Sequence, residues 1–281
     1  MRSSILSGES NKTLDRQLGA FANVDNTDHA DFIERLDEMH GLDSFKAYKL
    51  ETFRLMRVAP GMAVADVGCG TGEDARGLSS FVGETGHVTG FDLSEAMIAS
   101  AKSRHAEVTG LGFQQASADA LGIADNSLDA IRADRVLIHV PDPSATIDEM
   151  IRVTRPGGRI VISEPDMPGF WVASDDHATT GVLVGAISKS CRHPYLPRDL
   201  WALFRDKGLK DLEITVRTIT SNEIGAIAKV LDLQAVMTLA TQAGLVAPAT
   251  AEAWMQDVME RAQTGRFVAA LSIVMMSGTK S

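Results

Sequence analysis

The amino-acid sequence predicts an α/β protein with a Rossmann-like, doubly wound and mostly parallel sheet of seven strands, to which helical cap insertions are added. Two observations carry this prediction. Between Met62 and Ser163, short β-rich runs alternate with helical patterns, and repeated βα units form a parallel sheet. The first β-rich run also passes through closely spaced glycines directly into a helical pattern. A chain of 281 residues is long enough for such a core with a cap.

The elements of the core follow one another in a regular order. The predicted strands are 64–67, 88–91, 112–115, 128–133 and 159–162. The predicted helices between them are 73–81, 94–105 and 143–154. The last of these helices has Asp142 as its expected N-cap and Pro143 in its first turn, both of which are typical of a helix start.

Segments on both sides of this core complete the expected domain organisation. Residues 1–57 are expected to form an N-terminal arm, polar over its first 30 residues, and a helical lid of two helices broken at Gly41. The core itself is expected to span 58–164. Beyond it we expect a cap insertion at 165–196, a continuation of the core at 197–220, a helical cap at 221–263 and the last core strand at 264–281. Within these segments the patterns predict helices at 197–207, 221–243 and 248–263 and strands at 211–218 and 266–276.

Composition limits the classes of partner. The formal net charge is −10 at pH 7, so no general attraction draws the surface toward phosphate backbones, and we expect no nucleic-acid partner. The two cysteines are Cys69, inside the glycine-rich turn, and Cys191, a usage that fits a reducing, cytoplasmic setting. Neither a signal-peptide pattern nor an apolar run of membrane-spanning length is found, so we expect a cytoplasmic protein without a membrane partner.

The most informative pattern is the segment 64–72, VADVGCGTG. Its alternate glycines let the backbone turn tightly and approach a ligand, and the helix that follows offers unpaired N–H groups to a carboxylate. A glycine triplet alone is also compatible with an ordinary strand-to-helix turn. Here, however, Asp92 ends the next strand, twenty residues beyond Gly72, where an acid can accept both hydroxyls of a ribose. Glu73 stands where G-x-G-x-x-G requires its last glycine, which argues against NAD or FAD.

With these residues the chain resembles the class I S-adenosylmethionine-dependent methyltransferases, in particular the branch that acts on quinones, sterols and natural products. The resemblance covers roughly residues 59–166 and implies S-adenosyl-L-methionine as the cofactor. It implies that the acid Asp66 and the glycine loop hold the methionine end of the donor, that Asp92 holds the ribose, and that Leu93 and Met97 flank the adenine. The cofactor-binding residues implied in this way are Asp66, Gly68, Cys69, Gly70, Gly72, Asp92, Leu93, Met97, Ala118, Asp119, Ala120 and Arg135.

Further segments match the family in the family's order. Asp119, between Ala118 and Ala120, resembles the acid that hydrogen-bonds the adenine amino group, with a solvated loop acid as the alternative. Segments 134–142 and 155–158 resemble those that follow the fourth strand and precede the fifth. One departure is Ala65, where many relatives carry Leu, and it affects only packing.

Methyl transfer mainly requires alignment of the acceptor and exclusion of water, with a general base only where the acceptor must lose a proton. His139 is the first candidate for a catalytic base, because the segment after the fourth strand lies at the carboxyl ends of the strands. Packing against the following helix is the alternative. Glu164, at the end of the fifth strand, is the second candidate, with a structural role equally open. The side chain of Arg135 can hold an acidic group of the substrate or form a salt bridge.

Large apolar side chains are concentrated outside the core, as a lid over an apolar acceptor requires, although core packing is the alternative for each of them. They are Met167, Phe170, Trp171, Tyr195, Trp201, Met237, Trp254, Met255 and Met259. No metal site is expected, because His177 and His193 lie near Asp175 and Asp176 without the tight spacing of metal ligands.

The sequence therefore predicts an enzyme that transfers a methyl group to an O, N or C atom of a small, partly apolar molecule such as a secondary metabolite. Two alternatives stay open: an enzyme of the same fold that catalyses a non-methylating reaction such as a cyclisation, and a non-catalytic partner subunit. The intact glycine loop, Asp92 and Asp119 argue against the second. A nicotinamide-dependent reductase is disfavoured because neither Tyr48 nor Tyr195 is followed by a lysine four residues later. The oligomeric state, monomer or homodimer, stays open.

Overall fold

The computed structural model describes residues 29–225, 227 and 233–281. Its centre is a sheet of eight strands in the order β3-β2-β1-β4-β5-β8-β6, with β7 paired to β8. The strands are β1 (Ala63–Val67), β2 (His87–Asp92), β3 (Leu111–Gln115), β4 (Leu128–Asp134), β5 (Thr154–Pro165), β6 (Trp171–Val172), β7 (Lys210–Ser221) and β8 (Ala269–Thr279). The helices are α2 (His29–Gly41), α3 (Asp43–Met56), α4 (Glu73–Val82), α5 (Glu95–Arg104), α6 (Pro143–Val153), α7 (His177–Lys189), α8 (Leu196–Asp206), α10 (Leu233–Gln242) and α11 (Pro248–Gln263).

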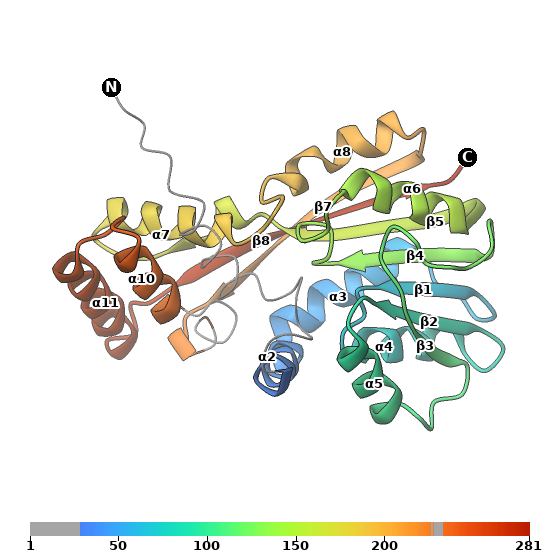
Figure 1. Ribbon diagram of the computed structural model, residues 1–281, viewed down its shortest axis with the longest axis horizontal. Helices are drawn as coiled ribbons and strands as arrows, with labels where there is room; N and C mark the ends of the chain where they lie inside the picture. The colour runs from blue at the N-terminus through green and yellow to red at the C-terminus, as the bar shows by residue number, and fades with distance from the viewer. Residues whose placement is uncertain (1–28, 226, 228–232) are drawn as a thin grey trace.

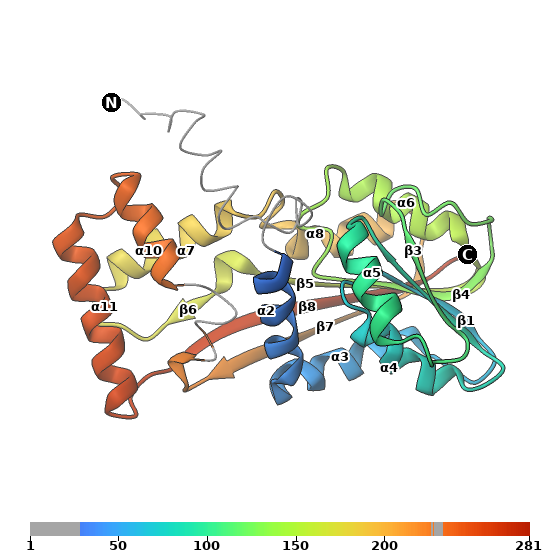
Figure 2. The ribbon, with the colours of Figure 1, turned by 60° about the horizontal axis from the view of Figure 1, so that its bottom comes forward.

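The parallel half of the sheet confirms the predicted fold class. Strands β1 to β5 pair in parallel, and α3, α4 and α5 cover one face while α6 and α8 cover the other (Figures 1 and 2). Because both faces are covered, β1 and β4 are buried almost throughout, including the charged Asp66 of β1 and Arg132 and Asp134 of β4. The strand order reverses between β1 and β4, and in such sheets ligands bind at the carboxyl ends of the strands at this reversal.

The other half of the sheet is antiparallel. Strand β8 lies between β5 and β7, with Val274 opposite both Glu164 and Val216. The predicted number of seven strands is wrong by one, because the short strand β6 pairs with the start of β8 at Ala269 and Ala270. A strand of two residues is too short to leave an alternating pattern in the sequence.

A separate group of helices lies at the outer end of the long β7 and β8 strands, away from β1, β2 and β3 (Figure 1). Here α7, α10 and α11 pack together, and the indole of Trp254 donates a hydrogen bond of 2.9 Å to Thr180 Oγ1. Helix α7 was not predicted. The helix expected at 221–243 is replaced at its start by the end of β7, while residues 226 and 228–232 lie outside the described residues. The predicted arm at 1–30 also lies almost wholly outside them.

The N-terminal helices reach the carboxyl ends of the parallel strands. Helix α3 packs against β4, β5, β7 and β8, and Arg54 bridges it to Glu213 of β7 at 2.6 Å. A bidentate ion pair between Asp37 and Arg104, with N–O distances of 2.7 and 2.9 Å, joins helix α2 to α5. Figure 2 shows α2 in front of the central sheet. Among the helices of the described residues, none is long and apolar enough to cross a membrane.

Candidate active site

The glycine loop between β1 and α4 has a backbone that only glycine adopts without strain. Gly68, Gly70 and Gly72 have φ angles of 69°, 53° and 87°. A Cβ atom on Gly68 would collide with the side chain of Val136, and one on Gly72 would lie 2.6 Å from Phe113 Cζ. The loop therefore packs so closely against the segment after β4 and against β3 that no side chain fits at these positions.

The acid at the end of β2 is held rigidly by the same loop. Asp92 Oδ2 accepts a hydrogen bond of 2.9 Å from the Gly70 amide, and Oδ1 accepts one of 2.9 Å from the Ser94 amide. The carboxylate also lines the cavity. Asp119 lies exposed after β3 and accepts a short hydrogen bond from the Ser117 hydroxyl.

One continuous cavity of 280 Å³ joins the glycine loop to the segment after β4. The predicted site residues that line it are Asp66, Gly68, Cys69, Gly70, Asp92, Leu93, Met97, Ala118, Asp119, Arg135 and His139. Gly72, Ala120 and Glu164 do not line it. The roles of the lining residues stay predictions, but the structure brings most of the proposed donor site together.

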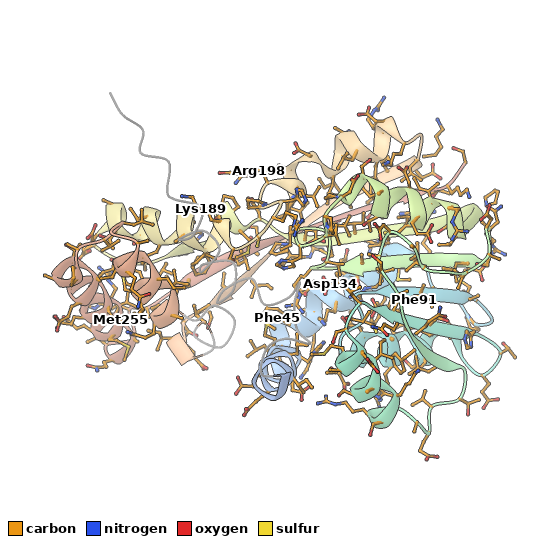
Figure 3. The ribbon with its side chains drawn as sticks, viewed as in Figure 1. Phe45, Phe91, Asp134, Lys189, Arg198 and Met255 are labelled. Atoms are coloured by element: carbon orange, nitrogen blue, oxygen red, sulfur yellow. The ribbon has the colours of Figure 1, made fainter. Side chains whose placement is uncertain are left out.

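None of the nine large apolar side chains expected to cover an acceptor lines this cavity, so this expectation is wrong. Met237, Met255 and Met259 instead line a groove of 510 Å³ between α10 and α11. Figure 3 shows Met255 far from Asp134. Trp254 is buried between helices of the cap. The groove contains none of the predicted site residues, so the cavity beside the glycine loop is the candidate site.

A cluster of buried charges forms the floor of the cavity. The Arg132 guanidinium, 1% exposed, lies 3.2 Å from Asp66 Oδ1, 2.9 Å from Asp74 Oδ2 and 3.3 Å from Asp134 Oδ2. Burial raises the pKa of Asp66 to about 7, although Arg132 acts in the opposite direction. One guanidinium on β4 thus connects acids from β1, α4 and the end of its own strand.

Helix α3 adds two more buried polar groups to this cluster. Lys49 Nζ lies 2.6 Å from Asp74 Oδ2, and the Tyr48 hydroxyl donates a hydrogen bond of 3.1 Å to Asp134 Oδ2. Burial alone would raise the pKa of Asp74, but Lys49 and Arg132 lower it well below its usual range. Burial lowers the pKa of Lys49. The sequence analysis missed these residues, whose only local signal is a lysine beside Tyr48 on the apolar face of a helix.

The segment after β4 is held in an unusual backbone conformation. Arg135 has a φ of 59°, a left-handed conformation that costs a residue with a side chain about 1 kcal/mol. Its amide donates a hydrogen bond of 2.8 Å to Ser163 O. Its guanidinium carbon lies 5.4 Å from the centroid of the Phe45 ring, and Nε lies 3.7 Å from Asp134 Oδ2. The side chain is therefore directed toward the cavity and the N-terminal helices.

The two candidate bases occupy different places. His139 is half-buried and lines the cavity, and its pKa is lowered to about 4 by burial and by Arg135, so the imidazole is neutral at pH 7. Glu164 is fully buried beneath the segment after β4, where its Oε1 accepts hydrogen bonds of 3.0 Å from the Val136 amide and 2.6 Å from the Leu137 amide. Glu164 thus positions this segment and does not face the cavity.

The class of protein follows from this fold and this site: the chain is an S-adenosylmethionine-dependent methyltransferase with a Rossmann-like core. More particularly, it belongs to the methyltransferase domain family, whose model matches residues 59–223, more than half of the chain. The donor implied by this family is S-adenosylmethionine. In the part of the chain that the structure describes, no group of three or more His, Cys, Asp or Glu side chains is arranged to hold a metal ion.

The chain is also similar to individual curated proteins. An uncharacterised 37.1 kDa protein of transposon Tn4556 from Streptomyces fradiae is 29% identical over 244 residues, which are 86% of this chain and 70% of that protein. The demethylmenaquinone methyltransferase of Staphylococcus aureus is 36% identical over 143 residues, 49% of this chain and 59% of that enzyme. The match thus spans less than two thirds of the length of the curated methyltransferase.

Solved structures show the same fold. The YcgJ protein from Bacillus subtilis superposes with a TM-score of 0.57 at 17% identity, covering 83% of this chain and 98% of that one. Phosphoethanolamine N-methyltransferase 2 of Haemonchus contortus superposes with a TM-score of 0.53 at 16% identity, covering 83% of this chain and 52% of that one. At these identities the likeness concerns the fold alone.

Proposed function

We propose that this enzyme transfers a methyl group from S-adenosylmethionine to an O, N or C atom of a small molecule. The observation that carries the proposal is the single cavity that the glycine loop, Asp92, Arg135 and His139 line together. Its volume of 280 Å³ is close to the lower limit for small-molecule sites. The bound donor supplies a methyl carbon that its sulfonium already activates.

The residues around the glycine loop fit this donor. Gly68 and Gly70 line the cavity without a side chain that would fill it, and α4 begins beside the cavity, where its first amide groups suit a carboxylate. Asp92 would accept hydrogen bonds from the ribose. Leu93 is exposed and Met97 is buried beside it, an apolar pair suited to flank the adenine.

Residues beyond the donor site would align the acceptor and exclude water. Leu36 of α2 is buried, and its Cδ1 lies 3.5 Å from the place of a Cβ on Gly70, so α2 covers the loop. Removing water in this way strengthens electrostatic interactions inside the site. The imidazole of His139 is neutral at pH 7, but its pKa of about 4 makes it a weak base, so it is better suited to orient an acceptor than to remove a proton from it.

Isothermal titration with S-adenosylmethionine and S-adenosylhomocysteine tests the proposal. We expect micromolar binding to the wild type and at least tenfold weaker binding to Asp92→Ala, because the variant loses a charged hydrogen-bond acceptor. The matched control is Glu107→Ala, which removes an exposed acid that does not line the cavity and should bind as the wild type does. Absence of wild-type binding would contradict the proposal and favour a non-catalytic partner subunit.

We also propose that the enzyme acts in the cytoplasm on a free small molecule and not on nucleic acid, in line with its net charge of −10. A homodimer is supported by β7, an edge strand that exposes Ile214 and Val216. Light scattering after size-exclusion chromatography tests this proposal. We expect the mass of a dimer, and the mass of a monomer at micromolar concentration would contradict it.

A further inference from the structure

Two guanidinium groups line the part of the cavity that is formed by the segment after β4. Arg135 comes from the segment after β4, and Arg192 comes from the turn between α7 and α8. Half-buried His139 lines the cavity with them. Segments more than fifty residues apart in the sequence thus place two permanent positive charges in this part of the cavity.

The position of Arg192 is fixed by its neighbour. The His193 amide donates a hydrogen bond of 3.0 Å to Ile138 O, and the His193 ring nitrogen Nε2 lies 3.0 Å from Val140 O. These two contacts hold the turn against the segment that carries His139. Across the described residues, no carboxylate pairs with the exposed guanidinium of Arg192. An exposed guanidinium that lines a cavity without a carboxylate partner is available to a ligand.

Arg135 also keeps hydrogen-bonding capacity. Its Nε is buried and forms no hydrogen bond within the part of the chain that the structure describes, and its nearest carboxylate oxygen, on Asp134, is 3.7 Å away. Glycine would adopt the left-handed backbone at this position more easily. The backbone cost of an arginine at this position is explained if its side chain has a function in the site.

The acids of the cavity offset these two arginines only in part. Asp74 is paired with Lys49, and Asp134, which faces Arg132, lies 3.7 Å from Arg135 Nε without a hydrogen bond to it. Within the described residues, no carboxylate pairs with Arg192. A cationic acceptor would therefore meet two like charges, whereas an anionic one would meet two opposite charges in a partly buried site.

We infer that the acceptor is an organic anion, a carboxylate or a phenolate, whose charged oxygen lies between Arg135 and Arg192. This inference rests on the proposed function. A lone pair of the acceptor oxygen would form the new bond to the methyl carbon, while the bond from that carbon to sulfur breaks and its electron pair stays on sulfur. The negative charge of the acceptor and the positive charge of the sulfonium cancel, so no proton has to be removed in the step.

The test is calorimetric titration of the protein saturated with S-adenosylhomocysteine, using benzoate, 4-nitrophenolate, benzyl alcohol and benzylamine as probes. We expect binding of at least one anion, with benzoate and 4-nitrophenolate distinguishing a carboxylate from a phenolate acceptor, and at least tenfold weaker binding of the alcohol and the amine. Arg192→Gln should weaken binding of the anion about tenfold, equivalent to about 1.4 kcal/mol. Arg192→Lys should retain part of the affinity. The control Arg205→Gln removes an exposed arginine of α8 that does not line the cavity and should change nothing.

The outcomes separate the inference from the proposed function. If S-adenosylhomocysteine binds but neither anion does, or the alcohol or amine binds as tightly as the anions, the inference is overturned and the proposed function stands. The same holds if Arg192→Gln binds the anion as the wild type does. If S-adenosylhomocysteine itself does not bind, the proposed function fails and the inference fails with it.

Discussion

Substitution of Arg132 by methionine removes the one guanidinium that contacts three buried carboxylates. These belong to Asp66, Asp74 and Asp134, at distances of 3.2, 2.9 and 3.3 Å. Methionine fills a similar length without charge and leaves Lys49 beside Asp74 and Arg135 beside Asp134 as the remaining cations. Breaking a buried ion pair by removing one partner costs about 3–5 kcal/mol, a large part of a total stability of about 5–15 kcal/mol. We therefore expect the free energy of unfolding of Arg132→Met to fall by about 3–5 kcal/mol.

Urea unfolding followed by circular dichroism at pH 7 measures this loss, with the free energy of unfolding taken by linear extrapolation. The matched control is Arg54→Met, which removes an exposed arginine that pairs with Glu51 and Glu213. Exposed pairs contribute about 0–1 kcal/mol, so this variant should stay close to the wild type. If Arg132→Met lost no more stability than Arg54→Met, the reasoning about the buried cluster would be refuted.

Three further changes test other parts of the site. Gly68→Ala places a Cβ atom on a residue with positive φ, where it collides with Val136. The distorted loop should weaken S-adenosylhomocysteine binding at least tenfold in calorimetry. Unchanged affinity would contradict the close packing of the loop against Val136. Burial raises the pKa of Glu164 from 4.5 to about 8, so the stability that its protonated form contributes is complete below pH 4.5 and is lost as the pH rises to 8. Glu164→Gln should flatten the pH dependence of the free energy of unfolding in this window, by up to about 1.4 kcal/mol per pH unit, and a slope equal to that of the wild type would show that Glu164 does not titrate there. Asp37→Asn breaks the exposed ion pair with Arg104. The free energy of unfolding should change by less than about 1 kcal/mol, while amide hydrogen exchange in α2 should become faster. Unchanged exchange would mean that apolar contacts alone hold α2.

The parallel core and the donor end of the site could be predicted because their signals are local. The glycine loop and Asp92 lie within thirty residues of one another, on consecutive strands whose carboxyl ends meet at one edge of the sheet. Helix α6 shows the same local logic, since Asp142 caps it by accepting hydrogen bonds from the Ser144 and Ala145 amides.

The buried charge cluster could not be predicted, because its contacts join residues far apart in the sequence. Lys49 and Asp74 are 25 residues apart, and Tyr48 and Asp134 are 86 apart. No spacing rule connects them. Only the packing of α3 across the ends of β1 and β4 brings their side chains together, and this packing is set by the whole fold.

The cap was misjudged for a related reason. Apolar periodicity in 221–263 correctly indicated helices, but periodicity does not say which surface a helix covers. In the structure α10 and α11 pack against each other and α7, so Trp254 is buried in the cap and Met255 faces its outer groove. Helix α7 was not predicted, because its apolar residues are not concentrated on one face of the helix and so leave no helical pattern in the sequence.

The most direct measurement is a crystal structure of the protein with S-adenosylhomocysteine bound. We expect electron density for the ligand along the glycine loop, with its ribose hydroxyls at the Asp92 carboxylate and its sulfur directed toward the part of the cavity lined by Arg135 and His139. Density in the groove between α10 and α11, or none in the cavity at a saturating ligand concentration, would contradict the assignment of the donor site.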